Sequence, residues 1–225
     1  MLLCTLVQTM NQVESIVQQA YKLNQDLDRM EDYAPEWREE WGVVDAKPIG
    51  ELANKDSLDM VFYDPEPIDS FKEIRMQGFL SNFEGIDYLY TEPMLPIMSK
   101  RMLSVLESVG DFPHQIIPTA IEDTQSMAGA DGKFRRSGKV NTDYVAVQLL
   151  EQLDIFDREN SIYEPGIFNP NDVGDIDKLV LKIPESGLPP IFRIANYSIV
   201  LYVSPEAKTA LEEAGITGIR FVPID

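Results

Sequence analysis

The sequence predicts an α+β protein in which helices pack on a mixed or antiparallel sheet. Two segments share one pattern, a capped amphipathic helix that ends at a glycine and leads into a strand. Short apolar segments between prolines, glycines and asparagines predict the strands. The protein has 225 residues, 44% of them hydrophobic, so it can bury a substantial core. We expect an N-terminal helical segment at residues 1–45 and an α+β domain at residues 46–225.

The N-terminal segment is predicted to hold one helix over residues 8–31, because apolar residues recur there at spacings of three and four. This stripe consists of Val13, Ile16, Val17, Ala20, Leu23, Leu27 and Met30. No proline or glycine interrupts the segment, and Pro35 ends it. The stripe is wide enough to pack against the domain or against a second copy of the protein, so a homodimer stays open.

Two further helices are predicted at residues 99–109 and 204–214. Ser99 and Ser204 are suitable N-caps, and each is followed at the same spacing by Leu-Glu and then by a glycine. Their sheet-facing residues are expected to be Met102, Leu103 and Leu106 in the first helix and Ala207, Ala210 and Leu211 in the second. Any strand–helix–strand unit could have a serine N-cap and a terminal glycine at these positions. The repeat by itself therefore indicates only two helices packed on a sheet.

The remaining elements are predicted from apolar segments and turn residues. The strands of the sheet are expected at residues 115–122, 143–150, 178–183, 190–194, 197–203 and 218–223. Two shorter strands are expected at residues 60–63 and 88–90, within a proline-rich region. Residues 154–177 are typical of irregular structure, and residues 124–141 of a loop containing three glycines.

Charge is the most unusual property of the sequence. There are 38 acidic residues against 19 basic ones, a formal net charge of −19. Residues 31–95 contain sixteen acidic and five basic residues, which gives −11 of the −19. Nucleic acid is therefore excluded as a favoured partner, because this field repels phosphate. A basic protein surface is the partner that the charge favours.

An aromatic–acidic segment inside this window is the predicted partner-binding site. Trp37 and Trp41 lie four residues apart and would share one face of a helix. The other predicted contact residues are Tyr33, Glu36, Glu39 and Glu40. Tryptophan and tyrosine are typical interface anchors, while the carboxylates would steer association. Two alternatives stay open: the acidic surface serves only solubility, and the two indoles belong to the core. The basic cluster at residues 131–139 is the second candidate contact, for an acidic cleft on the partner.

From about residue 60 to its end, the sequence resembles a large family of bacterial immunity proteins from polymorphic toxin systems. The segments that carry the resemblance are residues 95–103, 116–119, 144–149, 156–161, 191–193, 203–207 and 217–221. The last two are the most specific, with Val-Ser-Pro-Glu-Ala from Val203 and Thr-Gly-Ile-Arg-Phe from Thr217. The N-terminal helix and the basic loop depart from the family pattern. The resemblance implies a cytoplasmic protein that neutralises one cognate antibacterial toxin by occlusion, with no chemistry or cofactor of its own.

Enzyme signatures are weak in this sequence. The single histidine, His114, follows a proline and is expected to be structural, and Cys4 lies in an apolar run. Residues 169–177 offer oxygen ligands for calcium, but Val180 occupies the position that requires a bidentate glutamate. Arg193 could bind a substrate carboxylate, although pairing with one of the many acids is the preferred interpretation. We therefore expect no catalytic residue, cofactor or metal.

The lone cysteine and the absence of an apolar run of about 18 residues favour a reducing, cytoplasmic setting away from the membrane. Two other function classes remain beside the immunity interpretation. One is an interaction or scaffold protein that dimerises through the N-terminal helix, and the other is a hydrolase that reverses the action of a toxin.

Overall fold

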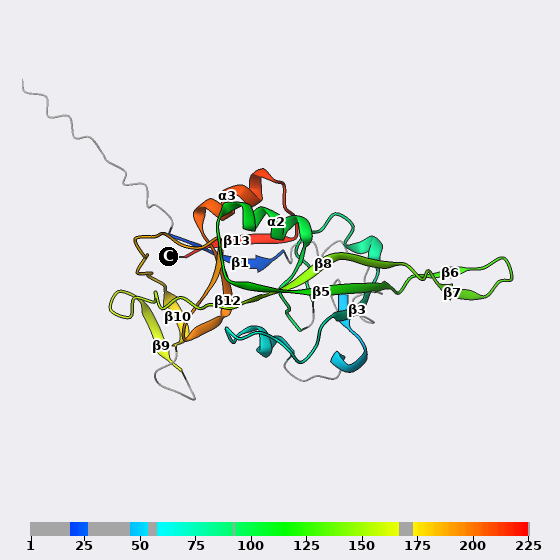
Figure 1. The fold of residues 1–225 in the computed structure, drawn as a ribbon, viewed down its shortest axis with the longest axis horizontal. Coiled ribbons are helices and arrows are strands. Elements are labelled where there is room, and N and C mark those ends of the chain that lie inside the picture. The colour runs from blue at the N-terminus through cyan, green and yellow to red at the C-terminus, as the bar shows by residue number, and fades with distance from the viewer. Residues whose placement is uncertain (1–18, 27–45, 54–57, 92, 167–172, 225) are drawn as a thin grey trace, which may run out of the picture.

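The fold is α+β, with many strands and two α-helices in the part of the protein that the structure describes (Figure 1). The computed structural model describes residues 19–26, 46–53, 58–91, 93–166 and 173–224. Its strands form a five-stranded sheet, a four-stranded sheet and two pairs. The two helices lie side by side over one side of the molecule (Figure 1).

The five-stranded sheet has the order β2-β3-β5-β8-β4. Its strands are β2 (Ala46–Pro48), β3 (Ile74–Gly78), β4 (Ile97–Ser99), β5 (His114–Asp123) and β8 (Val140–Leu149). Only the β3–β5 pair is parallel, so the sheet is mixed, as predicted. Pro118 lies opposite Val145 in β8, and it precedes Thr119, the first residue of β5 that pairs with β3.

The four-stranded sheet has the order β11-β12-β1-β13 and is antiparallel throughout. Its strands are β1 (Tyr21–Gln25), β11 (Ile191–Ile194), β12 (Tyr197–Val203) and β13 (Ile219–Pro223). A separate pair, β9 (Ile162–Pro165) with β10 (Val173–Lys178), lies at one end of the molecule. The predicted strands at 115–122, 143–150, 190–194, 197–203 and 218–223 are confirmed. The single sheet expected from them is wrong, because the first two belong to the five-stranded sheet and the other three to the four-stranded sheet.

Both predicted domain helices are confirmed, as α2 (Lys100–Val109) and α3 (Pro205–Glu213). The Ser99 hydroxyl accepts from the amide of Met102 at 3.0 Å, and the Ser204 hydroxyl accepts from the amide of Ala207 at 3.1 Å. The sheet-facing positions are buried as expected, except that Ala210 is only half-buried. One core joins both helices to both large sheets, so these elements stabilise one another.

The predicted helix at residues 8–31 is wrong over its described part, because residues 21–25 form strand β1. β1 pairs with β13 along its whole length and with β12 at its first two residues. Leu23, which fits the helical stripe, also fits a strand and is only 5% exposed here. Backbone pairing on both edges outweighs the local helical periodicity, which is a weak preference over five residues. Residues 8–18 and 27–31 lie outside the described residues.

Five other local predictions need correction. Residues 58–62 form a 3₁₀ helix, not a strand at 60–63, and residues 88–90 contribute only one bridge, from Tyr88 to Met98. Residues 154–177, predicted to be irregular, include β9 and most of β10. The register of this pair is interrupted by bulges, so the sequence does not alternate regularly between apolar and polar residues as a typical strand does. The strand predicted at 178–183 is absent from the described structure beyond Lys178 and an isolated bridge at Leu181. The loop at 124–141 contains a hairpin, β6 (Ser126–Ala128) with β7 (Phe134–Arg136).

Candidate functional site

The partner site predicted from the sequence cannot be placed in this fold. Tyr33, Glu36, Trp37, Glu39, Glu40 and Trp41 all lie outside the described residues. Their role in partner binding therefore stays a prediction. Two features of the described residues stand out in their place, a cleft beside β1 and a basic hairpin that projects from the body.

The cleft arises where two neighbouring strands separate. β1 pairs with β12 only at Tyr21 and Lys22, whereas it continues along β13 as far as Gln25. Beyond this point the two strands border a cavity of about 530 Å³. The described residues that line it are Leu23, Asn24, Gln25, Tyr63, Tyr88, Tyr90, Met94, Pro96, Arg193, Ile199, Val200, Leu201 and Arg220. This described lining includes two arginines and no aspartate or glutamate, although acids outnumber bases two to one in the sequence.

Arg193 is the most unusual residue of the cleft. It is only 4% exposed, and its guanidinium lies 5.2 Å from the centroid of the Tyr63 ring. Nη1 donates to the carbonyl of Ser198 at 2.6 Å, while Nε is buried without an acceptor. No carboxylate among the described residues forms an ion pair with it, so the acid partner expected from the sequence is not found there. Burial lowers the pKa of Arg193 to about 10, against the opposing influence of Tyr88 and Tyr63. The guanidinium is thus charged at neutral pH, with no anion beside it among the described residues.

The two tyrosines next to Arg193 are neutral hydroxyl donors. Burial raises the pKa of Tyr63 to about 12, assisted by the hydrogen bond that its hydroxyl donates to Asp59 at 2.9 Å. Burial also raises the pKa of Tyr88 to about 12. Neither phenol ionises near neutral pH, so neither can neutralise the arginine.

A buried aspartate holds the cleft wall that includes Tyr88. The Asp87 carboxylate accepts from the Ser99 hydroxyl at 2.6 Å, from the Thr217 amide at 3.0 Å and from the Arg101 guanidinium. Arg101 also donates to the carbonyls of Ala214 and Gly215 at 3.1 Å. Although burial acts to raise the pKa of Asp87, the bonds from Arg101, Ser99 and Thr217 lower it overall. This network joins the segment before β4 to both helices and to β13.

Gly218 allows the same wall to approach β13. Its φ is +79°, and a Cβ there would lie 2.4 Å from the Tyr88 carbonyl oxygen and 2.6 Å from Cγ2 of Ile86. Only glycine fits both constraints. The sequence indicates Ser99 as a helix cap and Thr217-Gly218 as part of the family resemblance, but nothing in it indicates that Asp87 connects Ser99 with Thr217.

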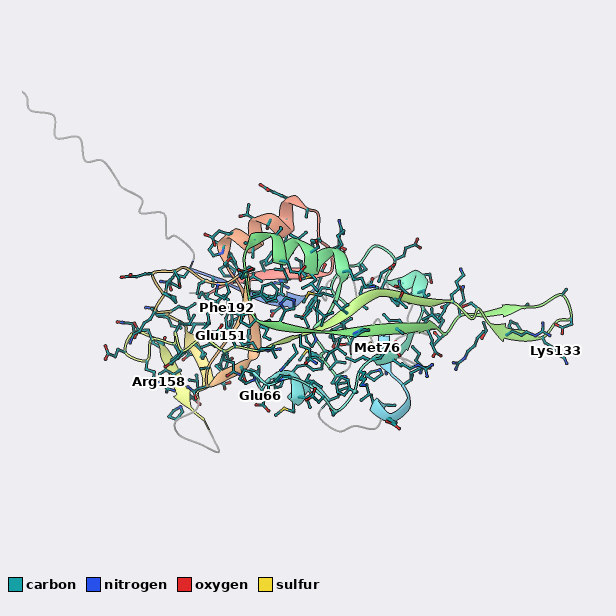
Figure 2. The ribbon with its side chains drawn as sticks, viewed as in Figure 1. Glu66, Met76, Lys133, Glu151, Arg158 and Phe192 are labelled. Atoms are coloured by element: carbon teal, nitrogen blue, oxygen red, sulfur yellow. The ribbon has the colours of Figure 1, made fainter. Side chains whose placement is uncertain are left out.

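The second feature is the basic ribbon, residues 124–139, which extends the β5–β8 pair away from the body (Figure 1). Lys133 lies at its outer end (Figure 2). Its four basic residues and one acid give a net charge of +3. The acid, Asp131, pairs with Arg135 at 2.6 Å, whereas Lys133 and Arg136 form no ion pair with described residues. The Phe134 side chain is 76% exposed.

The base of the basic ribbon is fixed to the body. The buried Asp123 carboxylate accepts from the Ser137 hydroxyl at 2.6 Å and from the amides of Gln125 at 3.1 Å and Leu80 at 3.3 Å. Burial acts to raise the pKa of Asp123, but these three bonds lower it overall. The ribbon therefore leaves the body in a defined direction.

Of the residues weighed for enzyme chemistry, Arg193 lies in the cleft, whereas His114 does not line it. His114 stacks on Phe112 with ring centroids 4.3 Å apart, and its Nε2 lies 3.4 Å from the Glu107 carboxylate. Cys4 and residues 169–172 lie outside the described residues, and Val173 to Asp177 belong to β10. Among the described residues, no group of three or more His, Cys, Asp or Glu side chains is placed to hold a metal ion.

Comparison of the sequence with protein-family models and with curated proteins found no match. Within the part of the protein that the structure describes, no helix is long and apolar enough to cross a membrane.

Proposed function

We propose that this protein is an immunity protein that binds and neutralises a cognate antibacterial toxin by occlusion, without chemistry of its own. The observation that carries the proposal is the basic ribbon, a projecting hairpin with an exposed aromatic ring and with cations that no described acid pairs. A monomer gains nothing from exposing Phe134 to this extent, because burying that ring would stabilise it. An interaction partner accounts for both the ring and the charges.

The way the ribbon is held favours tight binding. Ordering a flexible loop at an interface costs free energy, and a hairpin that is already paired and fixed at its base avoids much of that cost. Phe134 supplies an anchor, while Lys133 and Arg136 are available for carboxylates. The surface that best fits this element is an acidic cleft on the toxin.

The acidic window, residues 31–95, is a second and independent argument for the same function. Its field accelerates capture of a toxin that also has a basic face. In this proposal Trp37 or Trp41 anchors that face, with Tyr33, Glu36, Glu39 and Glu40 around it. The immunity protein would act in the cytoplasm, where the toxin acts on its producer.

The proposal predicts that a toxin gene lies beside the gene of this protein, and co-expression with that toxin tests it. The wild-type protein should restore growth of cells that make the toxin. Phe134→Ala and the double change Lys133→Gln with Arg136→Gln should weaken protection, whereas Lys100→Gln with Lys178→Gln, at exposed sites on the body, should preserve it. Failure of the wild-type protein to protect against its neighbouring toxin would overturn the function. Full protection by folded ribbon variants would show that the ribbon does not contact the toxin and would leave the acidic window as the predicted contact.

A further inference from the structure

Beyond toxin binding, we propose that the cleft between β1 and β12 is a binding site for a carboxylate attached to an apolar or aromatic group. Arg193 binds the carboxylate, and the tyrosines and the apolar rim contact the apolar or aromatic group. Nothing in the proposed neutralisation by occlusion requires this site, so the two proposals stand or fall separately.

The first step of the argument is the uncompensated charge. Proteins bury a guanidinium only when an anion or several acceptors compensate it, because desolvation otherwise disfavours the charged form. Of the five N–H donors of Arg193, only one has an acceptor among the described residues, the carbonyl of Ser198. Nε is buried without an acceptor. An anion in the cleft would supply the missing compensation.

The second step concerns the sign and size of that anion. No acid lines the described part of the cleft. The rest of the protein is strongly negative, so a dianion such as a phosphate monoester is repelled more than a carboxylate. The planar fork of arginine also matches the geometry of a carboxylate. A single carboxylate is therefore the group that the cleft favours.

The third step concerns the rest of the ligand. Met94 and Ile199 lie on the rim and are 62% and 58% exposed, although both are large and apolar. Tyr63 and Tyr90 are half-buried in the same lining. The volume of about 530 Å³ lies within the range of small-molecule sites, roughly 300–1,000 Å³. These surfaces suit a ring or a branched alkyl group whose carboxylate points inward to Arg193.

Calorimetric titration of the full-length protein with 3-phenylpropionate, and with its neutral analogue 3-phenylpropionamide, tests the site. The acid should bind at least about tenfold more tightly than the amide, since a hydrogen bond between charged groups is lost. A second arm compares acetyl-Ala-Ala-Phe that ends in a free carboxylate with the same peptide amidated. Tighter binding of the small acid identifies a metabolite-like ligand, and tighter binding of the free-acid peptide identifies the C-terminus of a polypeptide.

Matched variants assign the binding to the cleft. Arg193→Gln should abolish the preference for the acid, whereas Lys100→Gln, at an exposed site away from the cleft lining, should leave it intact. Should Arg193→Gln fail to fold, Ile199→Glu places a carboxylate at the exposed rim and should weaken binding at least tenfold, while Ile199→Gln should not. Equal binding of acid and amide, no binding of either, or tight acid binding by folded Ile199→Glu would overturn the proposal.

Discussion

Replacement of Asp87 by asparagine should destabilise the protein. Asp87 is 4% exposed, and its carboxylate receives hydrogen bonds from Ser99, Arg101 and Thr217. Asparagine keeps the shape but turns an NH₂ group toward donors. Each charged hydrogen bond is worth about 1.5–3 kcal/mol, but the losses do not add and the Arg101 side chain is 54% exposed to water. We expect a loss of about 2–3 kcal/mol.

Thermal and urea unfolding of the variant measure this loss. For a domain of this length, about 2–3 kcal/mol corresponds to a fall in Tm of roughly 4–12 °C. Asp143→Asn makes the same chemical change at an exposed site and should stay within about 0.5 kcal/mol. Adding Arg101→Gln should cost less in the Asp87→Asn background than in the wild type, because the two residues are coupled. An Asp87→Asn protein as stable as Asp143→Asn would refute the reasoning.

Three further outcomes follow from the same contacts. The folded-state pKa of Asp87 is lowered, so the stabilisation that its carboxylate provides is complete above the pKa of the unfolded state, about 4, and is lost as pH falls through the folded-state value. In urea titrations, the difference in unfolding free energy between Asp87→Asn and wild type should therefore be smaller at pH 3 than at pH 7. Gly218→Ala should cost about 2–4 kcal/mol by urea unfolding, whereas Gly187→Ala, where a Cβ meets no atom within 4 Å, should cost only about 1 kcal/mol of backbone strain. Phe134→Ala should leave Tm unchanged, since an exposed ring adds little to stability; a clear fall would show that the ring packs on the body.

The helices and the central strands could be predicted because their signals are local. Ser99 and Ser204 cap the helices through bonds that span three residues, and the apolar stripe that each helix buries is visible in the sequence. The long strands β5 and β8 each contain an apolar stretch, at residues 116–117 and 144–147 respectively. Such elements need little information from distant parts of the sequence.

The remaining features depend on distant partners. Residues 21–25 form a strand only because β12 and β13, almost two hundred residues later, lie beside them. The hydrogen bonds of Asp87 reach residues 99, 101 and 217, and nothing near Asp87 in the sequence indicates this. The sequence drew attention to Arg193 as a lone cation between apolar neighbours, but only the fold shows it in a cleft whose described lining holds no acid. Burial and pairing are properties of the packed protein, so local pattern could not supply them.

The most direct test of neutralisation by binding is a titration of toxin activity with purified immunity protein. A stoichiometric inhibitor should reduce the activity linearly to zero at one equivalent, and dissociation of the complex in denaturant should return toxin of unchanged mass and activity. An enzyme that modifies the toxin or reverses its effect would act at far less than one equivalent. Complete loss of toxin activity at a small fraction of an equivalent, or a changed toxin mass, would contradict neutralisation by binding.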